Sequence, residues 1–318
     1  MSKQATGTAE KFDASAKPRV DRPEPRFRVA DYAVLLKPRV MSLVVFTAFV
    51  GLFLAPGTLD IWTATIAILC ISIGAGASGA INMWYDRDID LHMLRTKNRP
   101  LPAGRLNPKE ALIFGATLSI GSVVIMGYLV NSAAAGLLAL TIFYYVFIYT
   151  VWLKRRTPQN IVIGGASGAL PPVIGWAAVT GDVGLGAIAL FAIIFLWTPP
   201  HSWALALFRK GDYEAAGVPM MPVVAGIRET KRQMLIYTAL LIPVTFAPVL
   251  IGMSGALYGI AAVLLGAGFA RHAWRVWKDP VEIEGGHAAK PMFLYSILYL
   301  FAVFLGLLAD RLLFIPVF

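Results

Sequence analysis

Nine apolar stretches alternate with short polar runs along this chain, and each is about long enough to cross a bilayer. They cover residues 40–56, 61–83, 110–130, 133–153, 160–180, 184–208, 234–253, 255–274 and 291–309. A transmembrane helix needs about 20 predominantly apolar residues. The least distinct divisions lie at Asn131-Ser132 and at the turn 252–255. The pattern predicts an all-α, polytopic membrane protein with about nine transmembrane helices.

The composition supports this class. Of the 318 residues, 58% are hydrophobic and 14% are charged, whereas a soluble domain carries about 25% charged residues. The single cysteine, Cys70, lies inside an apolar stretch. A disulfide framework and a cysteine-based metal site are therefore excluded.

The positions of the basic residues give the chain an orientation. The net charge is +10, which in a soluble protein would suggest nucleic acid as a partner. Here Lys and Arg gather in the N-terminal arm and after the second, fourth, sixth and eighth apolar stretches, and the runs 57–60, 131–132, 181–183 and 252–254 contain neither. By the positive-inside rule the N-terminus and the basic loops are cytoplasmic and the C-terminus lies on the opposite side. Nucleic acid is not an expected partner.

The first 28 residues differ from the rest of the chain. They mix Lys, Arg, Pro, Ala, Asp and Glu without an apolar core, so we expect a disordered, basic cytoplasmic arm. The arm also lacks the apolar region of a signal peptide. Residues 29–318 are expected to form one membrane domain.

A column of polar residues ends the second apolar stretch. Asn82, Asp86 and Asp90 are spaced four residues apart, so on a helix they lie within a stripe of about 80°. Carboxylates bind a diphosphate through Mg²⁺, which takes a few carboxylates, waters and phosphate oxygens. Asp88 points off the stripe and is expected to be solvated or paired with Arg87. The alternative is a charged helix end that only marks the membrane interface.

A basic run follows the column. Arg95, Lys97, Arg99 and Arg105 are suited to holding phosphate oxygens by charge-assisted hydrogen bonds, and Arg99 is the first candidate. The alternative for each is the ordinary charge of a cytoplasmic loop.

A second polar patch follows the sixth apolar stretch. Asp212 is again an acid at a cytoplasmic helix end, beside Arg209 and Lys210, and His201 lies eleven residues earlier. On one continuous helix His201 would lie about 20° from the face of Asp212 and about 16 Å deeper, although Pro199-Pro200 can break or kink that helix. An ionisable residue at this depth indicates function. The alternative is a histidine hydrogen-bonded to a neighbouring helix.

These motifs resemble a known family. Asn82-x₃-Asp86-x₃-Asp90 followed by Arg99-Pro100-Leu101 is similar to the first motif of the UbiA-type intramembrane prenyltransferases. Further stretches resemble the branch of this family that acts on heme, namely 37–40 (KPRV), 154–160 (KRRTPQN), 164–172, Pro199-Pro200-His201-x-Trp203-Ala204-Leu205, and Asp212-Tyr213 with Ala216-Gly217-x-Pro219-Met220. The resemblance runs from about residue 30 to the C-terminus.

The resemblance implies a nine-helix fold around a central cavity, in a bacterial cytoplasmic (inner) membrane. It also implies that farnesyl diphosphate, heme B and water give heme O and diphosphate. One or two Mg²⁺ ions would be held by Asn82, Asp86, Asp90 and Asp212. The diphosphate would be bound by Arg99, Lys97, Lys154, Arg209 and Lys210. His201 would orient the porphyrin, ligate its iron or act as a base for the water.

The second motif departs from the wider family. Many members carry Asp-x₃-Asp there, whereas Asp212 is followed four residues later by Ala216, a difference that the heme-directed branch shares. A complex with a heme A synthase or with terminal oxidase assembly proteins is a further hypothesis from the resemblance. The open alternatives are a prenyltransferase for another acceptor such as a quinone precursor, a transporter, and a non-catalytic oxidase assembly factor.

Overall fold

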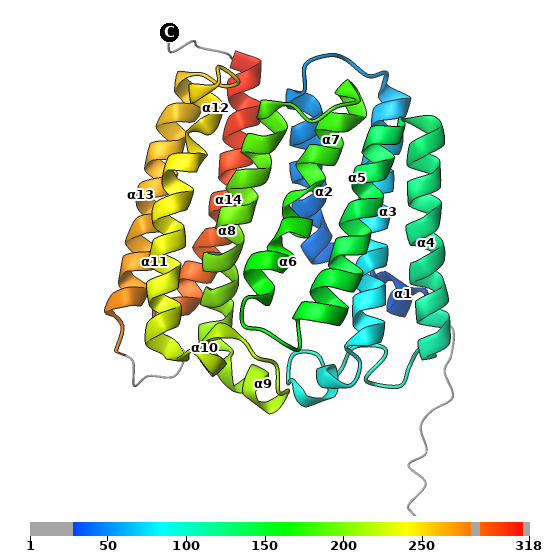
Figure 1. The fold of residues 1–318 in the computed structure, drawn as a ribbon, viewed down its shortest axis with the longest axis vertical. Coiled ribbons are helices and arrows are strands. Elements are labelled where there is room, and N and C mark those ends of the chain that lie inside the picture. Colours follow the sequence, from blue (N-terminus) through cyan, green and yellow to red (C-terminus); the bar gives the residue numbers. More distant parts are fainter. Residues whose placement is uncertain (1–27, 281–286, 314–318) are drawn as a thin grey trace, which may run out of the picture.

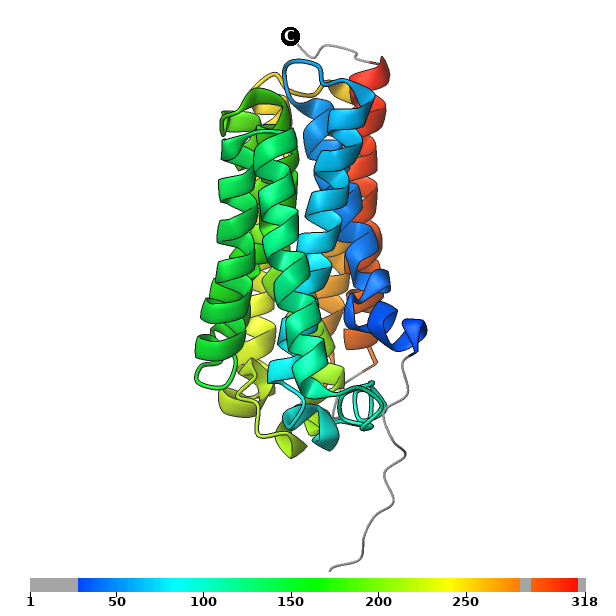
Figure 2. The same ribbon diagram turned by 90° about the vertical axis from the view of Figure 1, so that its right-hand side faces the viewer.

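The described part of the chain is a bundle of long helices that run roughly parallel to one axis (Figures 1 and 2). The computed structural model describes residues 28–280 and 287–313, and within these ranges it contains no strand. The arm expected at 1–28 lies outside the described residues apart from Arg28. The helices are α1 (Val29–Leu35), α2 (Pro38–Leu54), α3 (Ile61–Tyr85), η1 (Ile89–His92), α4 (Pro108–Leu129), α5 (Ser132–Phe143), η2 (Tyr144–Leu153), α6 (Asn160–Ala169), α7 (Pro171–Thr180), α8 (Leu185–Phe208), α9 (Lys210–Ala215), α10 (Met221–Val224), α11 (Gly226–Thr245), α12 (Ala247–Leu250), α13 (Ala256–Lys278) and α14 (Ala289–Leu313).

The prediction of about nine spanning helices is confirmed. Eight helical segments among the described residues are long and apolar enough to cross a membrane, and α1 with α2, bent by 53°, would make a ninth. The two indistinct divisions are real breaks. Asn131 separates α4 from α5 because its side chain accepts a hydrogen bond from the Ala134 amide and so caps α5. Gly252 lies in the turn just beyond α12 and has a φ of 69°, which glycine adopts without strain.

Several helices extend beyond the apolar stretches at one end of the bundle. This end carries the short helices α9 and α10, which lie side by side at the bottom of Figure 1. Its connecting segments are 86–107, 154–159 and 209–225, and we call it the basic end because these segments hold many of the Lys and Arg residues.

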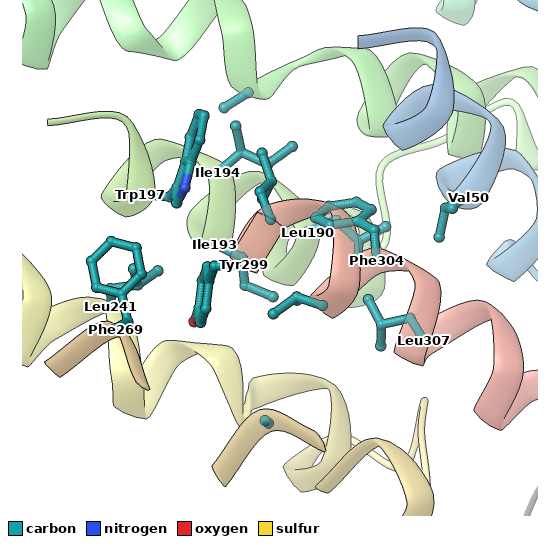
Figure 3. Close-up of a cluster of buried hydrophobic side chains, with 14 of the residues drawn as sticks. Val50, Leu190, Ile193, Ile194, Trp197, Leu241, Phe269, Tyr299, Phe304 and Leu307 are labelled. Atoms are coloured by element: carbon teal, nitrogen blue, oxygen red, sulfur yellow. The ribbon is translucent and has the colours of Figure 1, made fainter. Parts of the chain in front are cut away.

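Two apolar clusters divide the bundle. One joins α8, α11, α13 and α14 through residues such as Leu190, Leu241, Phe269 and Phe304 (Figure 3). The other joins α3, α5 and α7 through residues such as Ile71, Leu138 and Ile174. Helix α2 contributes to both clusters and therefore links the two halves.

The link between the halves depends on two glycines. A Cβ atom on Gly51 would lie 2.1 Å from the Pro172 carbonyl oxygen, and one on Gly175 would lie 2.1 Å from the Ala48 carbonyl oxygen. Because both obstacles are backbone atoms, only glycine permits this close approach of α2 and α7.

We therefore expect Gly175→Ala to destabilise the protein by about 1–3 kcal/mol, the usual cost of overpacking a close-packed interior. Gly136→Ala on α5 is the matched control, because its new methyl group meets nothing within 4 Å, and we expect it to be neutral or slightly stabilising. Thermal unfolding in detergent measures both. Equal effects of the two substitutions would contradict this account of the α2–α7 contact.

Candidate functional site

A polar pocket of about 220 Å³ lies at the basic end. Its lining includes four cationic side chains, Lys37, Arg95, Arg99 and Lys154, and one acidic side chain, Asp90. Tyrosine and asparagine side chains complete the wall, among them Asn82, Tyr145, Tyr149, Asn160 and Tyr213. The excess of positive charge suits the pocket to an anion.

The predicted column of Asn82, Asp86 and Asp90 does not lie on one regular helix. Helix α3 ends at Tyr85, Asp86 caps it, and Asp90 lies in the short helix η1. The backbone nevertheless continues the helical bonding pattern, since the Asp86 amide bonds to the Asn82 carbonyl and the Asp90 amide to the Asp86 carbonyl, both at 2.9 Å. The three side chains are 4%, 1% and 1% exposed, so all of them are turned into the protein.

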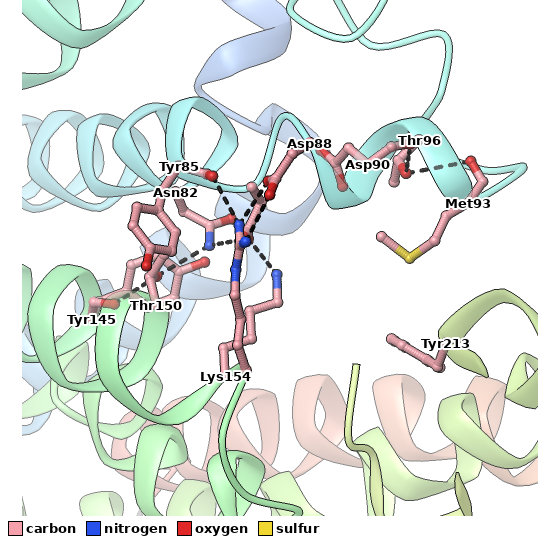
Figure 4. A network of polar contacts seen from close by, with 12 residues as sticks. Asn82, Tyr85, Asp88, Asp90, Met93, Thr96, Tyr145, Thr150, Lys154 and Tyr213 are labelled. Carbon is pink, nitrogen blue, oxygen red and sulfur yellow. Dashed lines mark hydrogen bonds and ion pairs between the residues drawn. The ribbon is translucent and has the colours of Figure 1, made fainter. Parts of the chain in front are cut away.

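Asn82 is the centre of a hydrogen-bond network (Figure 4). Its amide nitrogen donates to Asp86 Oδ2 at 2.8 Å and to Thr150 Oγ1 at 3.1 Å. Its amide oxygen accepts from Lys37 Nζ at 2.9 Å. Lys37 has a φ of 51°, a left-handed conformation that few residues other than glycine adopt. This unusual turn between α1 and α2 directs the ammonium group into the polar pocket.

Each acid of the column is paired with a cation. Asp86 Oδ2 accepts from Lys154 Nζ, while Arg155 lies 3.6 Å from Oδ1. Asp90 Oδ2 accepts from Arg99 at 2.7 Å. The column and the basic residues therefore form one charged site, in which carboxylates and cations from distant segments form ion pairs.

Asp88 lies outside this site, as the sequence indicated, but its partner is not Arg87. It binds both terminal nitrogens of Arg155 at 2.7 Å, whereas Arg87 donates to the Trp84 carbonyl. The Arg155 hydrogen bond lowers the pKa of the Asp88 carboxyl from 3.8 to about 2. Since this pKa is depressed in the folded state, the contribution of the pair to stability is complete above about pH 4 and is lost as the pH falls towards 2.

The site fits a magnesium ion that binds together with a phosphate-bearing ligand. Within residues 28–280 and 287–313, no three Asp, Glu, His or Cys side chains are grouped so as to hold a metal ion. Mg²⁺ typically uses one or two protein carboxylates and completes its shell with waters and substrate phosphates. Asp86 does not line the polar pocket, but its Oδ1 atom is buried without a hydrogen-bond partner, and its Oδ2 atom accepts hydrogen bonds from Asn82 and Lys154.

The second acid is placed differently from the prediction. Helix α8 ends at Phe208 and α9 begins at Lys210, so His201 and Asp212 do not share a continuous helix. Pro199 and Pro200 do not break α8, which continues through both. Asp212 does not line the polar pocket, although its neighbour Tyr213 does. Asp212 Oδ2 is buried and has no hydrogen-bond partner among the described residues.

The basic residues predicted to bind diphosphate differ in whether they line the polar pocket. Arg99 and Lys154 line the polar pocket, whereas Lys97, Arg209 and Lys210 do not. Lys97 and Arg209 are exposed, and Lys210 forms an ion pair with Glu214 at 2.5 Å. Arg105, from the same run as Arg99, binds Asp31 at 3.1 Å and so joins α1 to the loop before α4.

Five residues that line the pocket were not singled out as site residues from the sequence, namely Lys37, Tyr145, Tyr149, Asn160 and Tyr213. Tyr213 was noted only as part of a motif, yet its hydroxyl accepts a hydrogen bond from Arg95 at 3.1 Å across a separation of 118 residues. Lys37 was noted only as part of a motif. The rings of Tyr145 and Tyr149 on η2 have centroids 5.3 Å apart and are tilted by 35°, and Asn160 begins α6. The shared signal is a polar or aromatic residue at the basic end of a spanning helix.

A larger, mostly apolar cavity of about 680 Å³ adjoins the polar pocket. Four residues line both spaces, namely Tyr145, Tyr149, Ile161 and Ser202. The walls come from α2, η2, α6, α8 and α14, so the cavity lies between the two halves of the bundle. His201 lines this cavity, deeper than Ser202, and the central cavity implied by the resemblance is therefore present.

Comparisons with known proteins agree with the fold. The pattern of the UbiA prenyltransferase family matches residues 44–310. Among solved structures, that of a digeranylgeranylglyceryl phosphate synthase is similar with a TM-score of 0.72 at 18% identity, covering 88% of this chain and 99% of that one. A UbiA homolog from Archaeoglobus fulgidus, solved with GPP and Mg²⁺, is similar with a TM-score of 0.61 at 17% identity, covering 87% of this chain and 99% of that one.

Two sequence relatives are much more similar. One from Mesorhizobium japonicum, named protoheme IX farnesyltransferase 2, is 62% identical over 280 residues, which cover 88% of this chain and 89% of that protein. Another from Parvibaculum lavamentivorans, named protoheme IX farnesyltransferase, is 59% identical over 283 residues, which cover 89% of each protein.

Proposed function

This chain belongs to the UbiA prenyltransferase family, and we propose that it transfers the farnesyl group of farnesyl diphosphate to a vinyl group of heme B with addition of water, giving heme O and diphosphate. The relatives that are 62% and 59% identical carry the name protoheme IX farnesyltransferase, which supports both donor and acceptor. The protein is thus a prenyltransferase. The transporter and assembly-factor alternatives are not favoured.

One observation carries the proposal: the cationic pocket lies beside an apolar cavity and shares four of its lining residues. A prenyl diphosphate has the same division, with a charged head and an apolar tail. The excess of cationic over acidic lining residues favours the head. The apolar walls favour the tail and a flat, largely apolar acceptor.

The chain's own charged groups would hold the diphosphate. Arg99 and Lys154, with Lys37 and Arg95, would donate hydrogen bonds to its oxygens. Mg²⁺ would be held by Asn82, Asp86 and Asp90, with Asp212 as the more distant candidate, and when bound it supplies positive charge that stabilises the departing diphosphate. The structure of a homolog with GPP and Mg²⁺ bound supports the proposal of a metal ion at this site.

The bond changes follow from the polarity of the site. The allylic C1–O bond breaks and its electron pair leaves with the diphosphate. The π electrons of the heme vinyl group form the new bond to C1, and the resulting cation beside the porphyrin takes the oxygen of a water molecule, which loses a proton. The apolar cavity excludes bulk water from the allylic cation. Tyr145 and Tyr149, at the junction of the two spaces, offer aromatic faces that stabilise positive charge.

We further propose that the basic end faces the cytoplasm of a bacterial cell, in the cytoplasmic membrane. The excess of Lys and Arg at this end supports that orientation. A complex with a heme A synthase or with terminal oxidase assembly proteins is a separate proposal. Co-purification in mild detergent tests it, and recovery of the chain alone would count against a stable complex.

Purified protein in nanodiscs, incubated with heme B, labelled farnesyl diphosphate and Mg²⁺, tests the reaction. We expect heme O by mass spectrometry, and none in the presence of EDTA. A quinone precursor offered in place of heme should remain unprenylated. Prenylation of the quinone precursor but not of heme would identify a different acceptor for the same donor chemistry.

The two neighbouring basic residues Arg99 and Lys97 should differ in effect. Arg99 lines the pocket and binds Asp90, whereas Lys97 is exposed. We expect Arg99→Gln to lower kcat/KM for farnesyl diphosphate by about a hundredfold, comparable to the loss of one transition-state hydrogen-bond donor. Lys97→Gln should change it only slightly. Equal losses would indicate that the loop rearranges when the diphosphate binds.

A further inference from the structure

Three hydroxyl groups lie where the polar pocket meets the apolar cavity. Tyr145 and Tyr149 on η2 and Ser202 on α8 line both spaces, and we call their side-chain hydroxyls the junction hydroxyls. None of the three forms a hydrogen bond with any residue that the structure describes. A hydroxyl group in apolar surroundings costs free energy unless it is hydrogen-bonded, so we expect a ligand at this junction.

Ser202 differs from the other serine and threonine residues of the cavity wall. Each of the other four donates a hydrogen bond to a carbonyl of its own helix three or four residues earlier, a common arrangement for these residues in helices. They are Ser42, Thr47, Ser167 and Thr198. Ser202 Oγ makes no such bond within residues 28–280 and 287–313. Its hydroxyl is therefore available to a molecule in the cavity.

Close packing against α6 brings η2 and α8 together at the junction. A Cβ atom on Gly164 would lie 2.3 Å from the Tyr149 ring, and one on Gly165 would lie 2.9 Å from the Thr198 side chain. Ser202 follows Thr198 by about one turn of α8, in the direction of the basic end. The two glycines thus let η2 and α8 approach neighbouring positions of α6, and this approach places Tyr149 and Ser202 at the same junction.

The junction hydroxyls suit a neutral polar molecule. The four cations of the polar pocket, Lys37, Arg95, Arg99 and Lys154, do not line the apolar cavity. An anion such as diphosphate is drawn towards those cations and away from uncharged hydroxyls. A hydroxyl group can both donate and accept, and a buried water molecule typically makes about three hydrogen bonds to such groups. Water is also the third reactant of the proposed reaction.

We propose that the junction hydroxyls bind the water molecule that adds to the prenylated porphyrin, with Ser202 as its principal partner. The inference rests on the proposed function and extends it by assigning a site to the water. The water oxygen forms a bond to the cationic carbon beside the porphyrin, and the proton that it loses passes to an oxygen of the departed diphosphate in the adjoining pocket. One bound water can thus react while the apolar walls keep bulk water from the allylic cation.

Loss of this water would change the product and not only the rate. The cation would instead lose a proton from the adjacent carbon, so that a double bond forms and the product is lighter than heme O by one water molecule. The two outcomes diverge after the prenyl group has been transferred. Their ratio is therefore independent of how much of a variant is folded and of how well it binds farnesyl diphosphate.

Mass spectrometry of the porphyrin products tests the site. In nanodiscs with heme B, farnesyl diphosphate and Mg²⁺, the wild type should give heme O whose hydroxyl oxygen comes from isotopically labelled water. Ser202→Ala should raise the share of the dehydrated product by about tenfold, near the upper end of what one neutral hydrogen bond contributes. The double variant Tyr145→Phe, Tyr149→Phe keeps both aromatic rings and should also raise that share.

Ser167→Ala is the matched control. Ser167 also lines the apolar cavity, but its hydroxyl donates to the Gly164 carbonyl at 2.8 Å and it does not line the polar pocket. We expect its product ratio to equal that of the wild type. A wild-type ratio in Ser202→Ala would overturn the proposal. An equal shift in Ser167→Ala would overturn it too, because the effect would then belong to the cavity wall in general.

A structure of the wild type in nanodiscs that reveals ordered waters separates this inference from the proposed function. We expect a water within hydrogen-bonding distance of Ser202 Oγ, and none there in Ser202→Ala. Ordered waters elsewhere but not at this position would overturn the inference even if the protein forms heme O, and so would a diphosphate oxygen in its place. If the wild type formed no porphyrin product, the proposed reaction would fail, and a water at Ser202 would keep the binding site alone.

Discussion

Asp86→Ala should lower the rate of heme O formation by about a thousandfold. Asp86 is 1% exposed, accepts hydrogen bonds from Asn82 and Lys154, and has one buried oxygen without a partner. In the proposed reaction Asp86 would help to hold the Mg²⁺ ion that stabilises the diphosphate as negative charge develops there. Removal of a single transition-state contact costs about 10²–10³ in rate, and this substitution also leaves Lys154 without its carboxylate. Mass spectrometry of heme O in single-turnover reactions measures the effect.

Asp88→Asn is the control for this prediction. Asp88 lies two residues away in the same acidic segment, but it is half-exposed and paired with Arg155 outside the pocket. An exposed ion pair contributes at most about 1 kcal/mol, so the rate should fall by less than about fivefold. Raising the Mg²⁺ concentration should not rescue Asp86→Ala. Comparable losses in the two variants would mean that the acidic segment acts as a unit of structure and not through one carboxylate.

The number of spanning helices was readable from the sequence because the thickness of a bilayer sets the length of each span. Apolar length and the alternation of basic loops depend on residues that are close in the chain, and both act on every span. Even the narrow divisions at Asn131 and Gly252 were visible, since a capping residue and a glycine with positive φ are local signals. The bend between α1 and α2 was not visible, because the left-handed φ of Lys37 carries no local signal for a lysine.

The site was only partly readable because it joins distant segments. Asn82, Asp86 and Asp90 are all turned into the protein although α3 ends before Asp86, because the backbone continues the helical hydrogen bonds. The position of Asp212 did not follow from helical geometry, since α8 stops at Phe208. Lys154 follows η2, a π-helical segment, so its register differs from that of an ordinary helix. A helical projection therefore misplaces any residue beyond such an irregular turn.

The same reasoning explains why Tyr213 was missed and Lys97 was included. Lys97 belongs to a run of basic residues, and runs are visible in one sequence. Tyr213 contributes through one contact with Arg95, 118 residues away, and only the folded chain brings that pair together. Charge patterns thus locate the end of the helix bundle that holds the polar pocket, whereas the identity of individual contacts depends on how the helices end.

Asp310→Ala should destabilise the protein by about 2–4 kcal/mol, although Asp310 is far from the site. Its carboxylate is fully buried on α14 and accepts hydrogen bonds from Ser254 Oγ at 2.8 Å, Gly255 N at 2.5 Å and Tyr258 N at 3.0 Å. It therefore caps the start of α13 from a neighbouring helix, and its loss would leave these buried donors unsatisfied, at about 1–3 kcal/mol for each group left without a partner. Thermal unfolding in detergent measures the change.

Asp60 provides the comparison that separates a buried cap from an exposed one. It caps α3 in the same way, accepting from the Trp62 and Thr63 amides at 3.0 Å, but it is exposed, so water can replace it. Asp60→Ala should therefore lower the midpoint of unfolding much less than Asp310→Ala. The effect of Asp310→Asn should lie between those of the other two substitutions. The asparagine oxygen can still accept a hydrogen bond, whereas its NH₂ group would face a donor that the second carboxylate oxygen now satisfies. If all three variants unfolded at the wild-type temperature, the α13–α14 contact would be held by apolar packing alone, and the buried carboxylate would need another explanation.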